Sequence, residues 1–147
     1  MAYDFDIRTT DMPDDMHLLL NEYHRDGWSA HPGFHEKTRH WLAAHRMFKQ
    51  LAAAVTTDTE TYLHRNHDPE DYAARLSYRG NALVWNLHGH HGWEDHNFFP
   101  ELSASDPRFD AGLDILESDH AALDLVLDHF TQTANRSLKL LQLDQCP

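Results

Sequence analysis

Four side chains in this sequence have the types and positions that suit a metal ion: His45, His90, Glu94 and His120. His90 and Glu94 are four residues apart, so on a helix they are neighbours and can reach one ion. Imidazole and carboxylate groups together suit iron, manganese or zinc. The chain has 14 histidines among 147 residues, so the positions of these few matter more than the total.

Helices must position these side chains, because apolar residues recur at spacings of three and four and regular alternation is scarce. Capping aspartates followed by proline mark two helix starts, at Asp68-Pro69 and Asp106-Pro107. Pro100 should end one helix, since proline lacks a backbone N–H. The stretch 56–67 is polar and gives no clear prediction, and the tail 135–147 is partly apolar without a strong period. We predict an all-α chain with helices over about residues 14–25, 34–55, 68–99 and 106–130.

Each of the three longer helices carries a histidine on its apolar face, at His45, His90 and His120. Glu94 continues the apolar stripe one turn after His90. Burying an ionised carboxylate costs several kcal/mol unless another group compensates. A metal ion in the core would supply that compensation and explain why these polar groups are tolerated there.

Each residue alone has a simpler interpretation. A single histidine such as His45 or His120 is usually a hydrogen-bonded core residue. His90 with Glu94 could be a buried ion pair. Joint placement on three helices favours a shared metal site. The roles of several other residues stay open: His64, His67, His88, His91, Asp95 and Asp124.

Two glycines, Gly89 and Gly92, lie beside these histidines. Each costs about 1 kcal/mol inside a helix relative to alanine. We expect either a close approach of another segment at this point or a helix kink without chemistry.

The composition argues against several classes of partner. The net charge of −12 repels phosphate backbones, which argues against nucleic acid. Neither a long apolar run nor a basic amphipathic face is present, so no membrane association is expected. The acidic start lacks the features of a signal peptide, and the single cysteine, Cys146, forms no internal disulfide. We expect one cytoplasmic domain over residues 1–147, with its core at about 34–130.

Three segments resemble those of hemerythrin-like (HHE cation-binding) domains. HHGWEDHNFFPEL, residues 90–102, is similar to the central motif of that family. WLAAHRMFKQL, residues 41–51, and LESDHAALDLVL, residues 116–127, resemble the first-helix and third-helix segments. The resemblance implies an antiparallel helix bundle around a non-haem di-iron centre. Carried over by position, the implied iron ligands are His45, His90, Glu94 and His120.

The sequence departs from the family pattern after Phe130, where no further His-x-x-x-Glu segment follows. We therefore expect one or two iron ions, with the second in doubt. The fourth helix is expected to be missing, or supplied by the terminal segments or a partner. Three helices alone would expose apolar surface, which favours a homo-oligomer.

The leading hypothesis is a non-enzymatic iron protein that binds or senses dioxygen or another small diatomic ligand, or handles iron. One alternative is a metalloenzyme, either an iron oxidase- or peroxidase-like site or a zinc hydrolase, since an open metal position allows these reactions. Another is a metal-free helical interaction module with structural histidines. Neither a general base nor a substrate-binding motif accompanies the candidate ligands, which ranks the enzyme lower.

Overall fold

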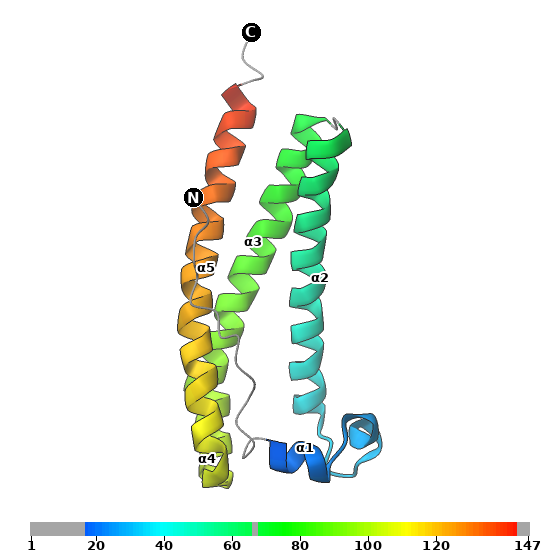
Figure 1. Ribbon diagram of the computed structural model, residues 1–147, viewed down its shortest axis with the longest axis vertical. Coiled ribbons are helices and arrows are strands. Elements are labelled where there is room, and N and C mark those ends of the chain that lie inside the picture. The colour runs from blue at the N-terminus through cyan, green and yellow to red at the C-terminus, as the bar shows by residue number, and fades with distance from the viewer. Residues whose placement is uncertain (1–16, 66–67, 144–147) are drawn as a thin grey trace. The chain divides into compact units, whose positions relative to one another are not determined.

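The computed structural model describes residues 17–65 and 68–143, and every regular element among them is a helix. The long elements are α2 (Glu36–Arg65), α3 (Pro69–Trp93) and α5 (Asp110–Leu143) (Figure 1). The short ones are α1 (Leu18–Glu22), the 3-10 helix η2 (Arg25–Ala30), the π-helix η3 (Glu94–Phe98), α4 (Phe99–Ser105) and the 3-10 helix η4 (Pro107–Phe109). The all-α prediction is confirmed, and these residues contain no fourth long helix.

The long helices pass through two compact units. Of the described residues, the first unit contains 17–44 and 91–123, and the second contains 45–65, 68–90 and 124–143. Each of α2, α3 and α5 therefore contributes one segment to each unit. None of the described helices combines the length and the apolar character that crossing a bilayer requires.

The core of the second unit explains why α2 continues ten residues past the predicted end at Val55. Tyr62 stacks on Tyr72 of α3, with ring centroids 4.4 Å apart. Asp58, which is buried, accepts a 2.6 Å hydrogen bond from Arg79 of α3. The polar stretch is thus helical because tertiary contacts with α3 hold it, although its own sequence has no strong helical period.

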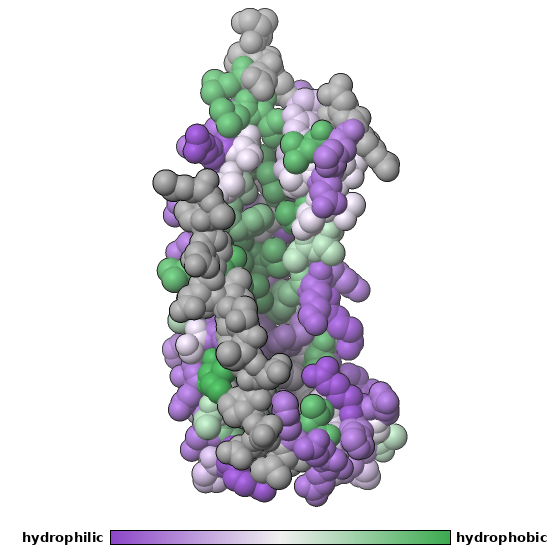
Figure 2. All heavy atoms as spheres, in the orientation of Figure 1, coloured by the Kyte–Doolittle hydropathy of each residue, from purple (hydrophilic) through white to green (hydrophobic). Residues whose placement is uncertain are grey.

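The tail of the chain continues α5 to Leu143, beyond the predicted end near residue 130. Ala134, Leu138 and Leu141 follow one another at spacings of four and three. They pack into the same core cluster as Leu76 of α3. The face of this unit in the upper part of Figure 2 shows hydrophobic residues gathered between α5 and α2.

The two helix starts that begin with aspartate are confirmed. The Asp68 side chain accepts a hydrogen bond from the Glu70 N–H at 2.8 Å, just before α3. The Asp106 side chain accepts from the Arg108 N–H at 3.0 Å, and α5 begins after the short helix η4. Hydrogen bonds from the Arg108 side chain and backbone also hold the pKa of Asp106 below its ordinary value.

The prediction that Pro100 ends its helix is wrong. The chain passes from α3 into the π-helix η3, where the Phe99 N–H donates to the Glu94 carbonyl, and then into α4. Pro100 lies in the first turn of α4, and the early positions of a new turn tolerate a missing N–H. The wider π turn changes the hydrogen-bond register at this point, and such turns are frequent at functional sites.

Among the described residues, α1 and η2 stand in place of the single helix predicted over about 14–25. Of that predicted helix, residues 14–16 lie outside the described residues. The Tyr23 carbonyl accepts the Trp28 indole N–H at 2.6 Å, where a continuing helix would use the Gly27 N–H. The Gly27 N–H instead donates to the His24 carbonyl at 3.0 Å, so the chain turns tightly here.

Candidate metal centre

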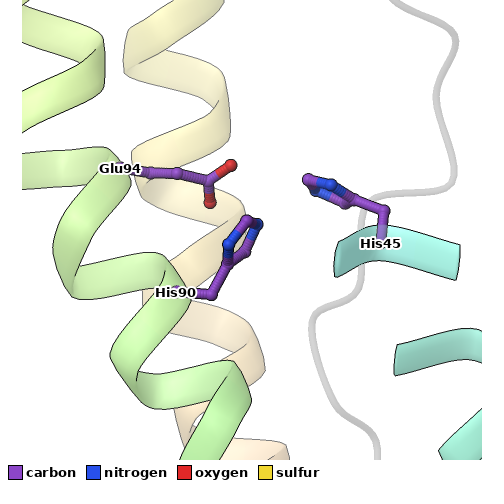
Figure 3. A group of neighbouring side chains, drawn as sticks. All are labelled: His45, His90 and Glu94. Carbon is purple, nitrogen blue, oxygen red and sulfur yellow. The ribbon is translucent and has the colours of Figure 1, made fainter. Parts of the chain in front are cut away.

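His90 and Glu94 occupy consecutive turns of one continuous helical segment. His90 lies near the end of α3, and Glu94 is the first residue of η3. Figure 3 shows both side chains on the same side of that helix, as the four-residue spacing predicts. The Glu94 side chain is the largest fully buried one among the described residues, with 1% of its surface exposed. An acidic group buried to this degree requires compensation from its surroundings.

His45, on α2, lies against His90. Their ring centroids are 4.7 Å apart and the rings meet edge to face. Phe48, which is buried, contacts both imidazoles. Ligand atoms of His45, His90 and Glu94 all lie within 4.8 Å of one another (Figure 3). We call these three residues the first candidate set, and all three belong to the ligands predicted from the sequence.

A second candidate set consists of His91, Glu94 and His120, whose ligand atoms also lie within 4.8 Å of one another. Glu94 therefore belongs to both sets. The rings of His91 and His120 are stacked, with centroids 4.1 Å apart and planes 12° apart. The fourth predicted ligand, His120, is thus grouped with His91 and Glu94.

His91 is a candidate ligand that the apolar-stripe argument left open. It lies about 100° around the helix from His90, outside the stripe. The structure buries it to 5% exposure, because His120 of α5 stacks against this side of the helix. A helix that packs against neighbours on two sides buries a wider arc than one stripe covers.

Hydrogen bonds orient Glu94 and His120. Glu94 Oε1 accepts the indole N–H of Trp41, and Glu94 Oε2 lies 3.3 Å from His120 Nε2. On the other side of the imidazole, His120 Nδ1 lies 2.7 Å from Asp95 Oδ1. An ionised carboxylate can only accept, so the Asp95 contact places a proton on His120 Nδ1.

This arrangement fits a cation. If the ring is neutral and carries its proton on Nδ1, the lone pair of His120 Nε2 faces a carboxylate oxygen of Glu94. A cation, or an additional proton, between these two atoms would make this 3.3 Å contact attractive. A histidine that binds metal through one nitrogen and donates to a carboxylate through the other is common in metal sites. Asp95 therefore has the position of a residue that orients a ligand.

Four further groups near or before the site, His64, His88, His96 and Asp124, are exposed or partly exposed, and His67 is not among the described residues. His88 Nδ1 lies 3.1 Å from Asp124 Oδ1, and both side chains are nearly half exposed. None of these groups belongs to a candidate set.

The two glycines near the site do not accommodate a neighbouring segment. A Cβ placed on Gly89 or Gly92 would meet no described atom within 4 Å. The expectation of a close approach is therefore wrong for the residues that the structure describes. The helix instead changes from α to π two residues after Gly92.

Trp41 is a site residue whose role the sequence did not indicate. Its indole N–H donates a hydrogen bond to the carboxylate of Glu94, 53 residues away. The π-helical turn that begins at Glu94 leaves no sequence signature apart from the nearby proline. Neither the Trp41–Glu94 hydrogen bond nor the π-helical turn could be found from the periodicity of the sequence.

Comparison with protein families matches residues 36–145 to the hemerythrin HHE cation binding domain. Comparisons with curated proteins and with solved structures found no match. The matched residues include α2, α3 and α5 in full, and every residue of both candidate sets. This chain therefore belongs to the hemerythrin HHE cation-binding domain family.

Proposed function

We propose that this chain is a non-haem iron protein that binds or senses dioxygen, with two iron ions held by the two candidate sets. One observation carries the proposal: the buried carboxylate of Glu94 is shared by two groups of histidines. A carboxylate has two oxygen atoms and can serve one ion through each. The proposal thus assigns His45 and His90 to one ion, His91 and His120 to the other, and Glu94 to both.

The donor set favours iron. Imidazole suits zinc, copper, iron and nickel, whereas carboxylate groups suit harder ions such as manganese and magnesium. Four imidazoles with one shared carboxylate combine both preferences, as iron sites do in helical bundles. Membership in a cation-binding family supports a metal at this position.

The residues around the ligands would keep the ions in a dry, fixed environment. Phe48 covers His45 and His90, and Phe99, which is 3% exposed, stacks on His120. Trp41 and Asp95 hold Glu94 and His120 by hydrogen bonds. Ferrous iron, when bound, supplies the electrons and the open coordination position that dioxygen binding requires. The protein's part is to place the imidazoles, neutralise charge through Glu94 and exclude water.

The first test is iron loading of the full chain without air, followed by elemental analysis and visible absorption spectra. We expect about two iron ions per chain, and an absorption band that appears with dioxygen and disappears when dioxygen is removed. Glu94→Gln should lose most of the iron. His96→Gln is the matched control, because His96 is an exposed histidine of the same π-helix.

The outcomes separate the parts of the proposal. Iron that is bound without any dioxygen-dependent spectrum would remove the dioxygen function and leave an iron-binding protein. Full iron content in Glu94→Gln would contradict the shared carboxylate. Zinc retained in preference to iron would favour the hydrolase alternative.

A further inference from the structure

A cleft of about 400 Å³ lies in the first unit, where α1, η2 and the start of α2 meet. Four of the eight residues that line it are aromatic: Tyr23, Trp28, Phe34 and Trp41. His31 and Thr38 add the polar groups. The volume falls in the range of small-molecule sites, which are mostly apolar with a few polar groups that fix orientation.

Hydrogen bonds hold the walls of this cleft in place. The Trp28 indole N–H donates to the Tyr23 carbonyl at 2.6 Å, so it is already used. His31 Nδ1 accepts the Gly33 N–H at 3.0 Å, and the His31 ring meets Tyr23 edge to face at 5.3 Å. Because Nδ1 accepts, a neutral His31 ring carries its proton on Nε2 and can donate from there. The cleft is thus an open aromatic depression with one imidazole donor in its lining.

We propose that this cleft binds a planar aromatic small molecule, and that the molecule influences the metal centre through Trp41. Aromatic rings gain about 0.5–1.5 kcal/mol from stacked or edge-to-face partners beyond the burial of their area. Four aromatic walls offer such partners to a flat ring, whereas a saturated ring of equal size gains only the burial. A hydroxyl or carbonyl on the ligand would be recognised by His31.

Trp41 connects the cleft to the candidate metal centre. Its indole lines the cleft, and its N–H donates to the Glu94 carboxylate. A ring packed against the indole changes the position of that N–H and so the strength of its hydrogen bond to Glu94. The strength of this bond in turn changes how strongly the Glu94 carboxylate attracts an ion. This second step rests on the proposed function of Glu94 as an iron ligand. By linkage, bound iron must change the affinity of the cleft by the same factor.

The binding step is tested on the metal-free full chain by calorimetric titration with 2-naphthol. Decahydro-2-naphthol is the matched saturated probe, and we expect it to bind about 10-fold more weakly. Phe34→Leu should weaken 2-naphthol binding by a smaller factor, because it removes one aromatic wall of four and keeps an apolar side chain. Trp85→Leu is the control, since Trp85 is 82% exposed and belongs to the second unit.

Gly33→Ala provides a second variant if Phe34→Leu does not fold. The added Cβ would lie 3.1 Å from His31 Nδ1 and displace that ring, so 2-naphthol should again bind more weakly. Equal affinities for the two probes would overturn the proposal. So would binding that persists in Phe34→Leu and Gly33→Ala but is lost in Trp85→Leu, because the probe would then occupy an exposed surface.

The coupling step compares 2-naphthol affinity with and without iron. We expect a difference in the parent chain and none in Trp41→Phe, which keeps an aromatic wall but removes the N–H. Equal affinities in the iron-loaded and metal-free parent would refute the coupling. The proposal that the cleft binds an aromatic molecule would then stand without it. If the chain binds no iron at all, the proposed function fails while the metal-free titration still decides on the cleft.

Discussion

Replacing Glu94 by glutamine should remove most of the stability that iron gives to the folded chain. Glutamine has nearly the size of glutamate, and its amide oxygen can still accept the Trp41 N–H. The substitution therefore preserves packing and this hydrogen bond while it removes the negative charge. Because both candidate sets contain Glu94, a single change affects both proposed ions.

The magnitude follows from linkage between binding and folding. An ion present at 100 times its dissociation constant stabilises the folded state by about 2.7 kcal/mol, so two such ions contribute about 5 kcal/mol. In a domain of this size, 1 kcal/mol changes the melting temperature by roughly 2–4 °C. Iron should therefore raise the melting temperature of the parent by roughly 10–20 °C. His45→Ala or His120→Ala should lose about half of this increase, and Glu94→Gln nearly all.

The assay is differential scanning calorimetry without air, with ferrous iron in one series and a chelator in the other. His96→Gln should behave as the parent does, because His96 is exposed and belongs to neither set. An undiminished iron effect in Glu94→Gln would refute the reasoning. Complete loss of the iron effect in His45→Ala would show that the two sets form one site rather than two.

Three further predictions concern the rest of the chain. Gly89→Ala should raise the melting temperature by roughly 2–4 °C, because alanine stabilises a helix by about 1 kcal/mol relative to glycine. The added Cβ would meet no described atom within 4 Å. A lower melting temperature would contradict this prediction. Arg108 lowers the pKa of Asp106 from its ordinary value of 3.8. The contribution of Asp106 to stability should therefore be present at neutral pH and be lost as the pH falls through this lowered pKa. Urea unfolding between pH 5 and 2 should show a free energy of unfolding that depends less on pH in Asp106→Asn than in the parent. Self-association remains a prediction. Large apolar side chains support it, such as Leu63 and Leu140, which are 69% and 54% exposed. Light scattering should detect a dimer or a larger species, and a monomer at working concentration would refute the prediction.

Short-range patterns in the sequence predicted the all-α fold, two helix starts and four candidate ligands. Asp68 and Asp106 cap the turns that directly follow them, so their effect is local and visible in the chain. The spacing of His90 and Glu94 places them on one helix face regardless of what packs there. The lengths of α2 and α5 were underestimated, because the ends of both helices depend on contacts with α3 in the second unit.

Only the tertiary structure decided how the candidate ligands are grouped. His91 became a candidate ligand because α5 brings His120 against its side of the helix, and one stripe does not reveal a second neighbour. Trp41 reaches Glu94 across 53 residues, and Asp95 reaches His120 across 25. Hydrogen bonds between residues so far apart leave no periodic trace in the sequence. Local periodicity therefore predicted which residues face the core, and packing between helices determined which of them share Glu94.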